Sequence, residues 1–180
     1  MATPQRITPF LWFANEAEDA ARFYTSIFKN SRIAAISRYS DAGKEVHGRP
    51  AGSVMTVAFE LDGHPFTALN GGPMFQFTEA VSFQIQCENQ EEIDYYWDRL
   101  SAGGDPTAQQ CGWLKDRYGL SWQVTPRMEQ FFAQDEKSPG AKRAMEAMLK
   151  MKKINIAELE RAARGDGGAA GAGARSTAKV

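Results

Sequence analysis

Residues 7–28 read ITPFLWFANEAEDAARFYTSIF, and a related pattern recurs at residues 80–100, AVSFQIQCENQEEIDYYWDRL. Each segment begins with alternating residue types, which predicts a strand, and continues with apolar residues at helical spacing. Between the two parts lies an asparagine, Asn15 or Asn89, a residue type that is favoured as a helix N-cap. The sequence therefore predicts a repeated unit that starts with a strand followed by a helix.

Further strands are expected after each of these helices. In chain order they are residues 32–39, 53–61, 65–70, 107–111, 110–115 and 120–125. Asp62–Gly63 is the expected hairpin turn of the first unit. The strand expected at 107–111 is short, and its sequence pattern is weak. The predicted fold class is α+β: residues 1–126 form two βαβββ modules, about 5–72 and about 79–126.

Residues 127–163 are expected to form helices outside the repeat. Ser138 followed by Pro139 is typical of a helix start. The apolar stripe of this region consists of Ala144, Met145, Met148, Leu149 and Met151. We expect most of the stripe to be core, and an exposed part would pack on a partner subunit. The glycine- and alanine-rich residues 164–180 are expected to be a disordered tail.

Alternation along the strands assigns side chains to faces. In each module one face is apolar and is expected to pack on the helix of its own module. The other face carries hydroxyls, amides and aromatic rings, which is the usual composition of a small-molecule pocket. A face open to solvent is the alternative. The residues of this face that are expected to bind a ligand are Thr8, Phe10, Trp12, Ser82 and Gln84.

The composition excludes several classes of protein. A formal net charge of −1 argues against a nucleic-acid partner, because such proteins carry a basic excess. No apolar segment has the length of a signal peptide or a membrane span, so the expected location is the cytoplasm. The two cysteines, Cys87 and Cys111, are expected to be reduced thiols. Cys111 is the best nucleophile candidate, but no base lies near it in the sequence, which favours a structural thiol.

Seven segments resemble those of PhnB-like proteins, a group within the glyoxalase, or vicinal oxygen chelate, superfamily. They are Ile7–Phe13, Phe23–Phe28, Leu69–Pro73, Glu79–Phe83, Tyr95–Trp97, Gln110–Asp116 and Tyr118–Val124. The resemblance covers about residues 5–160. It implies two βαβββ modules that form an incomplete barrel, in a bacterial protein that is usually a homodimer. The family is often labelled 3-demethylubiquinone-9 3-methyltransferase.

In metal-dependent relatives, the resemblance places the ligands near Thr8, Asn70, Ser82 and Gln123, to within about one residue. It thereby adds Asn70 and Gln123 to the residues expected to bind a ligand. None of these is a histidine, carboxylate or cysteine, and hydroxyls and amides hold transition metals weakly. His47 and His64 are expected to be exposed to solvent. The sequence therefore predicts a cleft with no metal and no cofactor.

The methyltransferase label is not supported by a recognisable cofactor motif. A Rossmann-type enzyme needs a glycine-rich turn that leads into a helix, whereas Gly71–Gly72 is followed by Pro73. Register across the turn at 116–119 is expected to put Trp113 beside Trp122, opposite Gln123, with both tryptophans in the core.

Two functions remain open at this point. The first is a binding module that holds a small hydrophobic or aromatic molecule without turnover. The second is an enzyme of the same superfamily, such as a lyase, a dioxygenase or the labelled methyltransferase, that acts on such a molecule. A protein whose dimer surface is its functional part is a third possibility.

Overall fold

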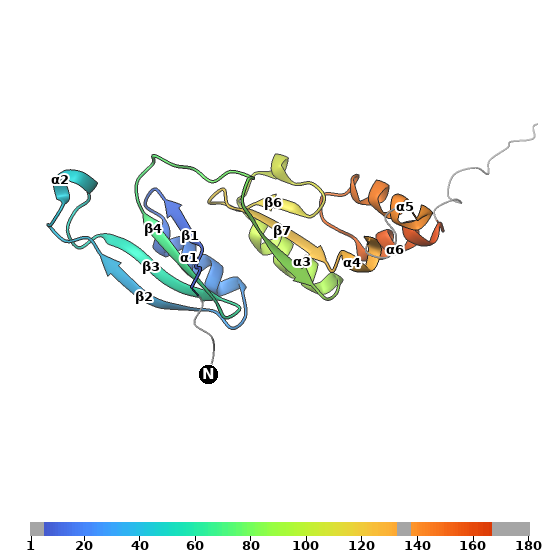
Figure 1. The fold of residues 1–180 in the computed structure, drawn as a ribbon, viewed down its shortest axis with the longest axis horizontal. Helices are drawn as coiled ribbons and strands as arrows, with labels where there is room; N and C mark the ends of the chain where they lie inside the picture. The colour runs from blue at the N-terminus through green and yellow to red at the C-terminus, as the bar shows by residue number, and fades with distance from the viewer. Residues whose placement is uncertain (1–5, 133–137, 167–180) are drawn as a thin grey trace, which may run out of the picture. The chain divides into compact units, whose positions relative to one another are not determined.

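The computed structural model describes residues 6–132 and 138–166. The chain divides after Val81 into two compact units, which are drawn in Figure 1. The elements of the first unit are β1 (Phe10–Phe13), α1 (Ala17–Ile27), β2 (Arg32–Arg38), α2 (Lys44–His47), β3 (Val54–Leu61) and β4 (His64–Asn70). This order confirms the predicted βαβββ module, with a short helix added in the loop after β2.

The four strands of the first unit form one mixed sheet in the order β1-β4-β3-β2. β1 runs parallel to β4, and the other neighbours are antiparallel. Asp62 and Gly63 both have positive φ, 47° and 76°, which is the geometry of the tight hairpin turn that the sequence predicts. Helix α1 covers one face of the sheet (Figure 1) and buries Tyr24 against Phe59.

The edge strand β2 is irregular. Its pairing with β3 shifts twice, between Ile33 and Ala35 and between Ser37 and Arg38. Such bulges twist an edge strand and interrupt its ladder. At the start of the strand, Arg32 donates two hydrogen bonds to Glu60 in a fork, of 2.9 and 2.7 Å.

The second unit begins with β5 (Ser82–Cys87) and α3 (Gln90–Ser101) and continues with β6 (Trp113–Lys115) and β7 (Ser121–Pro126). Its sheet has three strands in the order β5-β7-β6. The prediction of a strand at residues 107–111 is wrong, because residues 106–108 form a 3₁₀ turn. Asp105 accepts a hydrogen bond from the Thr107 amide at 2.8 Å, and Pro106 cannot donate to a ladder.

The two helix starts differ more than their sequences suggest. Asn89 caps α3 as predicted, since its side chain accepts from the Glu92 amide at 2.9 Å. Asn15 does not cap α1, which is a correction, because its side-chain oxygen instead accepts from Arg49. The amide of Ala17 in the first turn donates to Asn70 of β4 at 2.8 Å. A distant residue thus takes over the role of a local cap.

The turn between β6 and β7 is built around a buried carboxylate. Asp116 is 2% exposed and accepts from the amides of Tyr118 and Leu120 and from the indole of Trp122. The segment DRYGLSW therefore holds its own turn together.

Three helices follow the second sheet: α4 (Glu129–Phe132), α5 (Pro139–Met148) and α6 (Ile156–Arg164). The predicted start of α5 is confirmed, because the Ser138 hydroxyl accepts from the Ala141 amide at 3.1 Å. In the apolar stripe Ala144 and Met151 are buried, whereas Met145 and Leu149 are exposed. Arg164 ends α6. The tail expected at residues 164–180 stays a prediction, because residues 167–180 lie outside the described residues. None of the described helices is long and apolar enough to cross a membrane.

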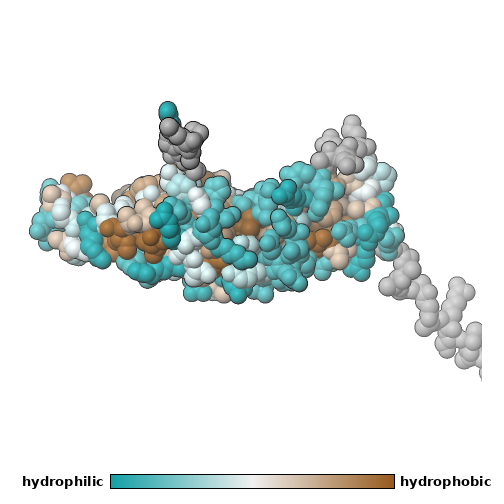
Figure 2. All heavy atoms as spheres, turned by 90° about the horizontal axis from the view of Figure 1, so that it is seen from below, coloured by the Kyte–Doolittle hydropathy of each residue, from teal (hydrophilic) through white to brown (hydrophobic). Residues whose placement is uncertain are grey.

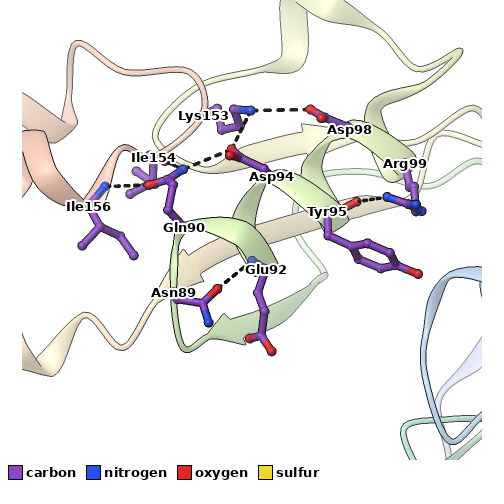
Figure 3. Close-up of polar contacts among 10 residues, drawn as sticks. All are labelled: Asn89, Gln90, Glu92, Asp94, Tyr95, Asp98, Arg99, Lys153, Ile154 and Ile156. Atoms are coloured by element: carbon purple, nitrogen blue, oxygen red, sulfur yellow. Dashed lines mark hydrogen bonds and ion pairs between the residues drawn. The ribbon is translucent and has the colours of Figure 1, made fainter.

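The segment between α5 and α6 is fastened to α3, as Figure 3 shows. The side chain of Gln90 donates to the Ile154 carbonyl at 3.1 Å and accepts from the Ile156 amide at 2.9 Å. Lys153 lies 2.7 Å from the Asp94 carboxylate, and its hydrogen bond lowers the pKa of Asp94. The Gln90 side chain therefore bonds both a backbone carbonyl and a backbone amide of this segment, as the backbone of a neighbouring strand does.

Replacing Gln90 with alanine is expected to release this segment. Two backbone groups lose their partners, which corresponds to a loss of about 2 kcal/mol in the free energy of unfolding. Faster hydrogen exchange at the Ile156 amide, measured by NMR, would locate the loss. The matched control is Glu91→Ala on the same helix, at an exposed position. Unchanged exchange at Ile156 in the Gln90 variant would contradict this role.

Candidate functional site: the open faces of the two sheets

The face of the first sheet that lies opposite α1 is open and aromatic. The register pairs Phe10 with Thr67 and Trp12 with Leu69, so these four side chains share that face. The face covered by α1 carries the buried Leu11, Phe13 and Val57 instead. Phe10 is 60% exposed and Trp12 is half-buried. Figure 2 shows apolar patches among hydrophilic residues within the first unit.

Trp12 is held in a defined orientation. Its indole nitrogen donates to the Gly72 carbonyl at 2.8 Å, and the ring of Phe75 meets its ring edge-on, with 4.9 Å between centroids. A Cβ on Gly71 would lie 2.2 Å from the Trp12 ring, so the indole packs directly on a bare backbone. The Gly71–Gly72 pair is thus explained by the packing of a tryptophan.

Two hydroxyls supply the polar part of this face. Ser37 and Thr56 are cross-strand partners, and their hydroxyl oxygens lie 2.5 Å apart. Neither these residues nor Phe75 was among the predicted site residues. The pairing of Ser37 with Thr56 depends on the bulge at Ala34 in β2, so strand alternation alone could not have located it.

Asn70 does not join Phe10 and Trp12. Asn70 pairs with Phe13 in the register and therefore lies on the face covered by α1, which corrects its expected position. Its amide accepts from Ala17 and donates to the Val54 carbonyl at 3.1 Å. Thr8 precedes β1 and is exposed.

The other three predicted residues are brought together on the second sheet. Ser82, Gln84 and Gln123 share one face. Gln123 donates to the Ser82 hydroxyl at 2.9 Å, and Gln84 donates to Thr125 at 3.1 Å. This face thus presents a row of amides and hydroxyls that are bonded across the strands.

Two features of this sheet bear on its chemistry. Trp113 pairs with Gln123, so it lies on the amide face and is half-buried. The expectation that both tryptophans are core is therefore correct only for Trp122, which is 2% exposed. The Ser121 hydroxyl is buried and has no hydrogen-bond partner among the described residues.

The two cysteines are free thiols, as predicted. Cys87 is buried, and burial together with the nearby Glu92 raises its pKa to about 12. A thiol with so high a pKa is protonated at neutral pH and is a poor nucleophile. Cys111 is half-buried and has a positive φ of 53°. Its amide and that of Gly112 donate to the carbonyls of Met151 and Lys152.

The residues that the resemblance aligns with metal ligands of other proteins do not suit a divalent metal. Both ends of the Asn70 amide are already bonded to the protein, and Gln123 and Ser82 are bonded to each other. Within residues 6–132 and 138–166, no group of three or more histidines, cysteines or carboxylates comes together. His64 is exposed as predicted. The prediction that His47 is exposed is wrong. Its ring is half-buried against the Tyr39 ring, with 4.5 Å between the two centroids.

Fold and site together define a glyoxalase-like α+β protein with two open sheets and additional C-terminal helices. The chain belongs to the 3-demethylubiquinone-9 3-methyltransferase family, which it matches over residues 5–125. Helices α4–α6 lie outside this match. The glyoxalase-like fold and the family that the sequence predicts are therefore confirmed.

Solved structures that match this chain include the following three. The PhnB protein of Bacillus cereus is 39% identical, with a TM-score of 0.57, over 68% of this chain and 99% of that one. Protein PA1353 of Pseudomonas aeruginosa is 19% identical, with a TM-score of 0.52, over 68% of this chain and 98% of that one. The fosfomycin resistance protein FosX of Listeria monocytogenes is 16% identical, with a TM-score of 0.45, over 72% and 98%. No curated protein sequence matches the chain.

Proposed function

We propose that this chain is a cytoplasmic binding protein that holds a small hydrophobic or aromatic organic molecule on its open sheet faces. The observation that carries the proposal is the face of the first sheet formed by Phe10, Trp12 and Phe75. Aromatic rings that are exposed yet fixed in orientation bind planar ligands well, because little conformational freedom is lost on binding. Phe10 and Phe75 are 60% and 57% exposed, and Trp12 is fixed by Gly72.

The polar groups on the open face of each sheet favour binding by hydrogen bonds. Those of the first sheet are Ser37 and Thr56, those of the second are Ser82, Gln84 and Gln123, and all are neutral donors and acceptors. General acid–base catalysis needs a group that titrates near the working pH, and none of these side chains does so. Binding without turnover is therefore our first choice.

A planar probe tests the proposal. Binding of 2-naphthol, followed by NMR shifts of the Trp12 indole, is expected to be saturable and to weaken about tenfold in Phe10→Ala, since one aromatic contact is lost. Phe10 is largely exposed, so its truncation leaves the fold intact. The control Val46→Ala, an 86% exposed position on α2, is expected to bind normally. Equal binding by both variants, or no shift at Trp12, would reject the site.

An enzyme acting on such a ligand is the second candidate, and the description of the family as a 3-demethylubiquinone-9 3-methyltransferase favours it. Mass spectrometry of the molecule that co-purifies with the protein would separate the two. A binding protein returns the molecule unchanged after incubation with a methyl donor, whereas a methyltransferase returns a product heavier by one methyl group.

The proposal includes a homodimer. Met145 and Leu149 on α5 are 39% and 54% exposed, and apolar side chains of this kind are typical of subunit contacts. Light scattering at micromolar concentration is expected to give twice the chain mass. A monomeric mass under these conditions would reject the proposed dimer. It would not bear on the proposed ligand site.

A further inference from the structure

A cleft of about 410 Å³ opens in the first unit, where the N-terminal end of α1 meets the loop before β3. Its charged lining residues are Glu18, Asp19 and Arg49, and Asn70 also lines it. Asn70 lies on the face of the sheet that α1 covers, so the cleft is separate from the open face with Phe10 and Trp12. Its volume lies within the usual range for sites that bind small molecules.

The positive charge of the cleft is held firmly in place. Arg49 is half-buried and donates to the Ala14 carbonyl at 2.7 Å and to the side chain of Asn15. A guanidinium has five N–H donors. The described part of the chain accepts from two of them, which leaves three for an oxyanion. A guanidinium is well suited to this because it binds carboxylates in a fork.

The negative charge of the cleft lies on the first turn of α1. Glu18 is already paired with Arg22, at 2.6 Å. Asp19 is exposed, and its carboxylate has no partner among residues 6–132 and 138–166. Two charged groups of the cleft therefore have no ion-pair partner among the described residues. They are the positive guanidinium of Arg49 and the negative carboxylate of Asp19.

Two of the remaining polar side chains of the cleft, those of Asn70 and Ser53, are bonded to the protein. The Asn70 amide bonds to Ala17 and Val54, and the Ser53 hydroxyl donates to the Pro50 carbonyl at 2.6 Å. A ligand would thus be recognised mainly through its charges. A ligand with a single charge would satisfy one of the two groups and place its charge near the other, like-charged group.

We propose that this cleft binds a small zwitterion of amino-acid size, with its carboxylate on Arg49 and its ammonium group on Asp19. The proposal is independent of the open-face site. A free α-amino acid carries both charges at neutral pH, its N-acetyl derivative carries only the negative one, and its carboxamide carries only the positive one. These three forms of one side chain therefore separate zwitterion recognition from simple charge attraction.

The test is calorimetric titration of the full chain with the twenty protein amino acids, followed by the N-acetyl and carboxamide forms of the best binder. At least one free amino acid is expected to bind saturably, and both derivatives are expected to bind at least about tenfold more weakly, since each lacks one charge-assisted contact. No saturable binding by any free amino acid, or equal binding by a derivative, would overturn the proposal.

Variants then locate the site. Asp19→Asn removes the negative charge at an exposed position and is expected to raise the Kd of the best amino acid about tenfold. Asp41→Asn, at an exposed position in the loop before α2, is the matched control and is expected to leave the Kd within about twofold of wild type, as surface substitutions usually do. Phe10→Ala is expected to have no effect. Unchanged affinity in Asp19→Asn would place the ligand elsewhere and overturn the proposal.

Discussion

Alanine in place of Asp116 is expected to lower the free energy of unfolding by about 4 kcal/mol, the largest effect of any single substitution discussed for this chain. The carboxylate is 2% exposed. Its two oxygens accept from the Tyr118 amide at 2.8 Å, the Leu120 amide at 3.1 Å and the Trp122 indole at 2.9 Å. Alanine would leave these three donors without their acceptor in a site that water does not reach.

Urea unfolding, followed by circular dichroism, would measure the change. Trp122→Phe removes only the indole donor and is expected to cost about 2 kcal/mol, including the loss of ring volume. Asp41→Ala, an exposed aspartate, is expected to change stability by less than about 0.5 kcal/mol. A loss in Asp116→Ala as small as that of the Asp41 control would show that the carboxylate does not organise the turn.

Alanine in place of Gly71 is expected to cost about 3 kcal/mol, because the new methyl group would lie 2.2 Å from the Trp12 ring and overpacking of this kind strains a core. The indole would have to move, and its 2.8 Å hydrogen bond to the Gly72 carbonyl would break. Binding of 2-naphthol is expected to weaken in parallel, since the ring that forms the proposed site is displaced.

A double-mutant cycle provides the control for this prediction. The three atoms nearest to the added Cβ all belong to Trp12. In a Trp12→Ala background, Gly71→Ala is therefore expected to cost less than about 0.5 kcal/mol by urea unfolding, and the difference is the coupling between the two sites. An equal cost in both backgrounds would place the strain in the backbone instead.

The sequence predicts local features well, because short-range chemistry determines them. Asn89 and Ser138 cap their helices as expected, and Asp62–Gly63 forms the expected tight turn. In each case the residue type and its immediate neighbours suffice, since capping and turn formation involve groups only two or three residues apart.

Long-range partners account for the predictions that are wrong. Asn15 has the same local pattern as Asn89, but its side-chain oxygen accepts a hydrogen bond from Arg49. Asn70, from strand β4, accepts from the first turn of α1 in its place. The resemblance to metal-dependent relatives assigns Asn70 to the ligand face to within about one residue, and a shift of one residue reverses the face. The two residues we now place in the zwitterion cleft, Asp19 and Arg49, are brought together by the fold, so no spacing in the sequence could have paired them.

The bulge at Ala34 in β2 also bears on how the protein behaves at high concentration. A foreign strand that approached this edge would find the register interrupted at Ala34, between Ile33 and Ala35. Fibril cores require segments of about six residues that stack without a break. The apolar stretch IAAI of this strand, which would otherwise favour fibril growth, is therefore protected by its own irregular backbone.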